Sequence, residues 1–234
     1  MAIVKKYPSK VVSIQNSIEG VYTLEFESLG KSFKYDAGQF LHLAIDEYDP
    51  SMQWPDSRCF SMQSSPDEEN IRITYAAKGQ FTKRMEQDLK VGSEVTLKLP
   101  YGDLFSQEHN KTNTVFIAGG TVVTPFLSLF THESFKEYIN PKIYLGFRSE
   151  AYNLYKGELE SMYRIRENSV NSSEFVKLVY EDKEGILDIE KIFKENGLNS
   201  NYFISGPPDM IKLFKQNLIS KGKSASGILT DEWE

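Results

Sequence analysis

The chain has 234 residues, of which 40% are hydrophobic and 26% charged, with a formal net charge of −6 at pH 7. This composition is typical of a globular protein with one large or two small domains, and the acidic balance disfavours nucleic-acid binding. No apolar run approaches the roughly 20 residues of a membrane span, so none is expected. The single cysteine, Cys59, permits neither an internal disulfide nor an iron–sulfur cluster and fits a reducing, cytoplasmic location.

Short segments of alternating polar and apolar residues fill the first part of the chain. Separated by Gly, Pro and Asp turns, they predict the strands of a small antiparallel β-barrel or sandwich. These segments cover 10–16, 20–28, 39–46, 58–65, 70–77 and 93–100. One helix is predicted over 81–90, where Phe81, Met85 and Leu89 recur at helical spacing.

The rhythm changes after residues 106–113, a polar stretch without periodicity that indicates a linker. Strands are then predicted at 114–119, 142–147, 174–180 and 201–206, with an edge strand within 226–234. Helices are predicted between them at 125–137, 154–166, 187–196 and 208–221. This alternation predicts a doubly wound parallel α/β sheet that binds ligands at the carboxyl ends of its strands. We therefore expect domains over 1–107 and 112–234.

Two motifs in the first half have groups suited to an anion. In RCFSMQSSP, Arg58 offers a bidentate fork for a phosphate, and Ser61 offers a hydroxyl to the polar edge of a flat ring. In AAKGQFT, Gly79 and Thr82 flank a helix entry with free N–H groups. Taken singly, the first motif is more readily explained as a strand that ends in polar residues, and the second as a loop with Thr82 near a helix N-cap.

Two further motifs end strands of the second half. In VFIAGGTVVTPF, a buried strand runs through Gly119-Gly120-Thr121 into a helix, a turn suited to a pyrophosphate. Val122 stands where a third glycine would allow closer backbone approach. In FISGPPDMI, Ser205 places a small hydroxyl at the carboxyl end of a strand before a proline helix start.

In order and spacing, these motifs resemble the ferredoxin–NADP reductase superfamily of flavoprotein oxidoreductases over nearly the whole chain. Arg58 to Pro66 is similar to the flavin motif, with Phe60 in place of tyrosine, and Gly79 to Thr82 to the pyrophosphate motif. The family's glycine turn with a following phenylalanine is matched at 102–105, and its coenzyme turn at 119–125. Its Gly-Pro-Pro motif is matched at 205–208, and its terminal acid-x-aromatic pattern at 231–233. The turn departs at Val122, and serine replaces cysteine at Ser205.

The resemblance implies an FAD-binding barrel followed by an NAD(P)-binding domain. It implies catalytic roles for Ser61, near flavin N5, and for Ser205, in the nicotinamide slot. Phe60 would stack on the flavin, and Trp233 would cover it until nicotinamide enters. The residues expected to bind FAD or coenzyme are Arg58, Cys59, Phe60, Ser61, Gly79, Gln80, Phe81, Thr82, Trp233, Gly119, Gly120, Thr121, Gly206 and Pro207. On residue chemistry alone, Cys59 is a small buried hydrophobe, and no metal site is expected.

The function implied is hydride transfer from NAD(P)H to FAD, followed by electron transfer to a ferredoxin-like protein, an oxygenase component or a small molecule. NADH is favoured because Glu181 and Asp182 follow the third strand of the second half and would repel a 2′-phosphate, although Arg148 and Lys183 could still serve one. The alternative is a non-catalytic or relay flavin subunit of a larger complex, whose coenzyme site is weakened by Val122. The oligomeric state stays open.

Overall fold

The computed structural model describes residues 3–166 and 175–231. The chain divides into two compact units, Met1–Asp103 and Leu104–Glu234, called unit 1 and unit 2 below. Each unit is described by itself. No helix in the described ranges is both long and apolar enough to cross a membrane.

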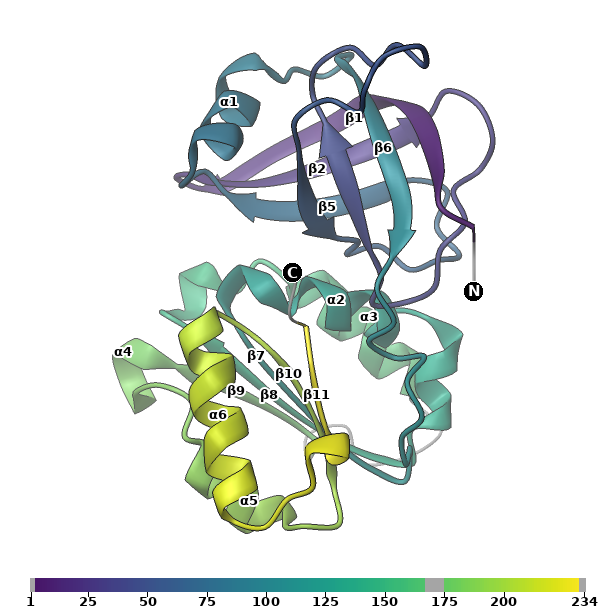
Figure 1. The fold of residues 1–234 in the computed structure, drawn as a ribbon. Helices are drawn as coiled ribbons and strands as arrows, with labels where there is room; N and C mark the ends of the chain where they lie inside the picture. Colours follow the sequence, from purple (N-terminus) through teal and green to yellow (C-terminus); the bar gives the residue numbers. More distant parts are fainter. Residues whose placement is uncertain (1–2, 167–174, 232–234) are drawn as a thin grey trace. The chain divides into compact units, whose positions relative to one another are not determined.

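Unit 1 is built on an antiparallel six-stranded sheet in the order β4-β3-β6-β1-β2-β5 (Figure 1). Its strands are β1 (Lys5–Ile18), β2 (Val21–Ser28), β3 (Phe40–Ala44), β4 (Ser57–Ser61), β5 (Ile71–Ala76) and β6 (Glu94–Tyr101). Beyond β4, the Gln63 N–H donates to the Arg72 carbonyl at 2.8 Å, so the chain after one edge strand bonds to the opposite edge. The expected barrel-like N-terminal sheet is confirmed.

Alternation along the strands forms the core of unit 1. In β2, for example, Leu24 and Phe26 are buried while Glu25 between them is not. Helix α1 (Gln80–Asp88) adds Phe81 and Met85 to this core. The helix ends two residues earlier than expected because Leu89 adopts extended backbone.

Unit 2 is a parallel sheet in the order β11-β10-β7-β8-β9, as expected for the coenzyme half (Figure 1). Its strands are β7 (Asn113–Gly119), β8 (Asn140–Phe147), β9 (Val176–Tyr180), β10 (Asn201–Ser205) and β11 (Ile228–Thr230). Its α-helices are α2 (Thr124–Phe130), α3 (Lys156–Arg166), α4 (Glu181–Glu184), α5 (Ile189–Asn196) and α6 (Pro208–Ser220). The predicted edge strand is β11.

Opposite faces of this sheet carry different cores. Val115 and Ile117 of β7 share a hydrophobic cluster with residues of α5 and α6, such as Ile192 and Leu218. Phe116, between them in β7, faces the other way. Its ring lies edge-on to Phe126 and Phe130 of α2 at 5.5 and 5.3 Å and stacks on Phe203 of β10 at 5.4 Å. Because alternate residues of β7 face opposite sides of the sheet and both are apolar, helices pack on both faces.

Three segments of unit 2 differ from the sequence-based expectation. The predicted helix 125–137 is interrupted, because His132 adopts extended backbone and caps a separate 3₁₀ turn, η2 (Glu133–Glu137), by accepting the Ser134 N–H. Residues 181–184, for which the sequence predicted no helix, form the one-turn helix α4, which ends at Gly185 with φ +80°. The expected linker is not free: the His109 ring lies 4.9 Å from Phe203 and bonds the Tyr138 hydroxyl at 2.8 Å.

Candidate functional site

Strand β4 and the start of α1 bring two of the predicted motifs together within unit 1. The Arg58 guanidinium lies over the Phe81 ring, with its Cζ 5.2 Å from the ring centroid. It donates to Asp56 Oδ1 at 2.7 Å and to the Ser57 carbonyl at 2.8 Å, and its side chain remains 54% exposed. Arg58 is thus held beside the helix entry while about half of its side chain remains exposed to solvent.

The N-terminus of α1 has the properties of a phosphate site. The Thr82 hydroxyl accepts the N–H groups of Lys78 and Gly79 at 3.1 and 3.0 Å, which orders the turn into the helix. No acidic residue lies in the first helical turn. A Cβ added at Gly79 would meet nothing nearer than the Thr82 hydroxyl at 3.9 Å, so the space above this backbone is open. An anion there would receive free N–H groups and the positive end of the helix dipole.

The other residues of the flavin motif alternate along β4. Phe60 points into the barrel with 9% of its surface exposed and meets the Tyr75 ring edge-on at 5.9 Å. On the opposite face, Cys59 Sγ lies 3.5 Å from His42 Nε2 across the strand pair, and burial raises the pKa of the thiol. Ser61, at the end of β4, is half-buried. Stacking of Phe60 on a flavin stays a prediction, because Tyr75 and the core already cover most of its ring.

The glycine turn after β7 is formed as the sequence suggested. Gly119 ends the strand, and Gly120 has φ +65°, a conformation that favours glycine. A Cβ at Gly120 would meet no atom within 4 Å, so the space above the turn is open. The 3₁₀ turn η1 (Gly120–Val123) then leads into α2, with Pro125 in its first turn. A pyrophosphate can therefore approach the turn at Gly120.

Val122 is accommodated without backbone strain. No non-glycine residue in the described part of the chain has a positive φ, so valine here is not forced into a left-handed conformation. Its carbonyl accepts a hydrogen bond from the Ser205 hydroxyl at 2.5 Å. The Val122 carbonyl thus connects the glycine turn to the end of β10 through a hydrogen bond that does not involve the valine side chain.

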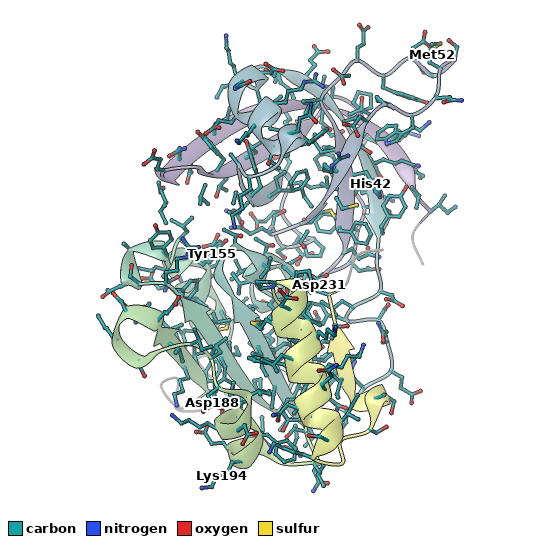
Figure 2. The ribbon with its side chains drawn as sticks, turned by 60° about the vertical axis from the view of Figure 1, so that its left-hand side comes forward. His42, Met52, Tyr155, Asp188, Lys194 and Asp231 are labelled. Carbon is teal, nitrogen blue, oxygen red and sulfur yellow. The ribbon has the colours of Figure 1, made fainter. Side chains whose placement is uncertain are left out.

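Ser205 is a buried junction at the carboxyl end of β10. It is 1% exposed, and besides Val122 its hydroxyl contacts Asp231 Oδ2 at 3.1 Å. Asp231 directly follows β11, the strand beside β10, and is labelled in Figure 2. Burial raises the pKa of Asp231 to about 7, partly offset by the bond to Ser205. One serine proton cannot serve both the Val122 carbonyl and a carboxylate, which also favours a protonated Asp231.

Three residues at this site were missed by the sequence analysis. Asp231 was part of a quoted terminal pattern, but its contact with Ser205 was not foreseen. Met210 lies against the glycines that end β10 and β7: a Cβ at Gly206 would overlap its methyl group, and one at Gly119 would lie 3.7 Å from its sulfur. The buried Tyr155 hydroxyl donates to the Thr121 carbonyl at 3.4 Å (Figure 2).

Of the remaining predicted residues, two are exposed, one packs against Met210 and one lies outside the described ranges. Gln80 is exposed in the first turn of α1, and Pro207 is exposed just before α6. Gly206 is half-buried under Met210. Trp233 lies outside the described residues, so its role as a flavin cover stays a prediction.

Comparisons with known proteins agree with this architecture. Residues 116–216 match the family model of the oxidoreductase NAD-binding domain. The chain is 24% identical over 221 residues to the reductase component of propane 2-monooxygenase from Mycolicibacterium smegmatis, covering 87% of this chain and 60% of that protein. The chain thus spans about three fifths of this curated relative.

Solved structures extend the likeness to both units. The ferredoxin NADP⁺ reductase of Neisseria gonorrhoeae, with bound FAD and NADP, superposes with a TM-score of 0.76 at 16% identity and 99% coverage of both chains. The ferredoxin–NADP⁺ reductase of Plasmodium falciparum gives a TM-score of 0.74 at 21% identity, covering 98% of this chain and 96% of that one. The chain therefore has the fold of these ferredoxin–NADP⁺ reductases, and its residues 116–216 match an oxidoreductase NAD-binding domain.

Proposed function

We propose that the chain is an FAD-dependent NADH oxidoreductase that delivers electrons to a separate acceptor. The observation that carries this proposal is the junction of Ser205 with the glycine turn, because it places a hydroxyl and open backbone together at the carboxyl ends of adjacent parallel strands. Relatives named as monooxygenase reductase components support it.

The residues present in unit 1 fit the diphosphate of FAD. Arg58 and the first turn of α1 offer a guanidinium and free N–H groups around an open space above Gly79. To bind a phosphate, the guanidinium would exchange or share its exposed pair with Asp56, which is a weak contact. A bound flavin would supply the redox chemistry, taking a hydride from NADH and giving electrons to the acceptor. Ser61 would hydrogen-bond the polar edge of the ring, near N5.

In unit 2, we assign coenzyme binding to Gly119, Gly120, Thr121 and the Gly206-Pro207 turn. The open face of Gly120 would admit the pyrophosphate, while Tyr155 holds the Thr121 carbonyl and so orients the turn. Ser205 would border the nicotinamide slot. Because its proton is engaged by Val122, it contributes a positioned lone pair and shape more than a free donor.

The coenzyme preference is assigned to NADH. Glu181 and Asp182, in α4 directly after β9, are exposed carboxylates, and neither forms an ion pair among the described residues. A carboxylate suits the 2′-hydroxyl of a ribose and repels a 2′-phosphate.

For the acceptor, we propose an oxygenase component or a ferredoxin-like protein, with a small molecule as the remaining possibility. The relatives' reductase components support an acceptor protein, and they count against the alternative of a non-catalytic relay subunit. Cys59 is a free thiol, which fits the reducing cytoplasm that we propose as the location.

An anaerobic visible spectrum tests this function. The purified protein, reconstituted with FAD if necessary, is mixed with one equivalent of NADH and, in a second cuvette, with NADPH. Prompt loss of the flavin bands with NADH and slow loss with NADPH is expected. Bands that survive both coenzymes would refute the enzyme function, and failure to bind FAD would refute the assignment of unit 1. Equal rates with both coenzymes would refute the preference alone.

A further inference from the structure

The carboxyl ends of β8 and β9 carry a group of exposed charged side chains, called the charged edge below. Its members are Arg148, Glu150, Lys156, Glu181, Asp182 and Lys183. Arg148 directly follows β8, and the others come from three short segments: the 3₁₀ turn η3 (Glu150–Tyr152), the start of α3, and α4 after β9. These segments are brought together by the parallel pairing of β8 with β9.

One carboxylate at this edge engages both lysines. Glu150 Oε1 lies 3.4 Å from the Lys156 Nζ, and Glu150 Oε2 lies 3.6 Å from the Lys183 Nζ. The Lys183 ammonium also lies over the Tyr180 ring at 5.4 Å, which confines it to the end of β9. Glu150 therefore links the loops that follow two neighbouring strands, and its single negative charge is shared between two ammonium groups.

The remaining cation is differently placed. The Arg148 guanidinium lies over the Tyr152 ring at 5.9 Å and forms no ion pair within the described part of the chain. The exposed acids Glu181 and Asp182 likewise lack a cationic partner there. With both lysines engaged, the charged edge presents carboxylates to solvent and one guanidinium resting on an aromatic ring.

The sheet order places this edge where the adenosine half of a coenzyme would lie. Strands β8 and β9 lie on one side of β7, and β10 lies on the other. A dinucleotide whose pyrophosphate sits at the turn after β7, with nicotinamide toward Ser205 of β10, extends its adenosine toward β8 and β9. The 2′ position of that ribose is the only chemical difference between NADH and NADPH.

We propose that Glu150 strengthens the preference for NADH, because its carboxylate competes with a 2′-phosphate for the ammonium groups of Lys156 and Lys183 and adds a negative charge beside them. The inference rests on the proposed NADH-dependent function and refines its coenzyme site. A phosphate monoester carries close to two negative charges at neutral pH, so it requires released cations as well as the absence of carboxylates. Glu150 acts against the phosphate in two ways: its carboxylate adds a negative charge, and it pairs with the ammonium groups of Lys156 and Lys183.

Binding of NAD⁺ and NADP⁺, measured by isothermal titration calorimetry on the FAD-loaded protein, tests this role. Glu150→Gln keeps the size of the side chain and removes its charge. We expect the ratio of the NADP⁺ to the NAD⁺ dissociation constant to fall about fivefold at low salt, with a smaller fall at high salt. The ratio of kcat/KM values for NADPH and NADH should shift in the same direction.

Two variants separate this mechanism from a general change of charge. Glu184→Gln removes a carboxylate from α4, the short helix that contains Lys183, but Glu184 forms no ion pair with either lysine. It should change the ratio less than twofold. In the Glu150→Gln background, Lys183→Gln should abolish most of the gain, because the released ammonium is gone.

An equal effect of Glu150→Gln and Glu184→Gln, or a gain that survives Lys183→Gln, would overturn the role of Glu150 and leave the proposed function standing. A wild-type protein that binds neither nucleotide would overturn the proposed function and this inference together.

Discussion

Replacing Asp231 with asparagine should change how the stability of unit 2 depends on pH. The pKa of Asp231 is raised from 3.8 to about 7 by burial beside Ser205. Between these two values the folded state holds a proton that the unfolded state has released. Stability therefore falls as pH rises through this window and levels off above about 7.

The magnitude follows from the same shift. Between pH 5.5 and pH 8, ionisation of Asp231 should lower the free energy of unfolding by about 2 kcal/mol, since each pH unit below the folded pKa contributes about 1.4 kcal/mol. Asparagine keeps an N–H donor toward the Ser205 oxygen and does not ionise. The free energy of unfolding of Asp231→Asn, taken relative to that of wild type, should thus be about 2 kcal/mol higher at pH 8 than at pH 5.5.

Unfolding in urea is measured at the two pH values, with hydrogen exchange of amides in β7 and β10 as the readout. This readout reports on unit 2 alone. Taking the difference between variant and wild type cancels the titration of all other groups. Asp209→Asn is the control, because Asp209 is exposed at the start of α6 and should show no pH-dependent difference. Parallel pH profiles for wild type and Asp231→Asn would refute the argument that burial protonates this carboxyl.

Three further substitutions test the two nucleotide sites. Gly120→Ala should lower the free energy of unfolding by about 1–2 kcal/mol in urea, because alanine is strained at φ +65° although no atom crowds its Cβ; an unchanged midpoint would contradict this. Val122→Gly should tighten NAD⁺ several-fold in calorimetry if the side chain obstructs the pyrophosphate, and unchanged or weaker binding would remove that explanation. Arg58→Gln should weaken FAD about tenfold by fluorescence titration, whereas Arg164→Gln, exposed on α3, should not; equal losses would count against a phosphate contact.

Local patterns predicted most of the fold because the relevant forces act between near neighbours. Alternation in β7 separates Phe116 from Val115 and Ile117, and helices on both faces follow from it. The interruption at His132 could not be foreseen, because it depends on a side-chain cap that competes with continuing α2. The helix α4 also escaped prediction, since four polar residues carry no apolar period.

The candidate site was predicted only where its residues adjoin a turn. Gly119 and Gly120 could be recognised because a tight turn after a strand favours glycine. Ser205 could be recognised because it stands at the end of a predicted strand. The bond between Ser205 and Asp231 joins residues 26 apart in sequence, and it exists only because β11 lies beside β10. The Glu150–Lys183 pair likewise needs β8 and β9 to be paired, which no local pattern specifies.

The aromatic contacts of Phe105, the residue just before the predicted linker, bear on how domains of this kind can be exchanged between proteins. Phe105 meets the rings of Phe116, Phe126 and Phe203 at 6.2, 6.0 and 5.2 Å, so its half-buried side chain packs against the core of unit 2. A gene fusion that began the coenzyme module at residue 112 would leave a hole under β7 and β10. A fusion that began at Leu104 would keep the Phe105 ring. Crossovers between relatives should therefore succeed between Asp103 and Leu104, ahead of the polar stretch.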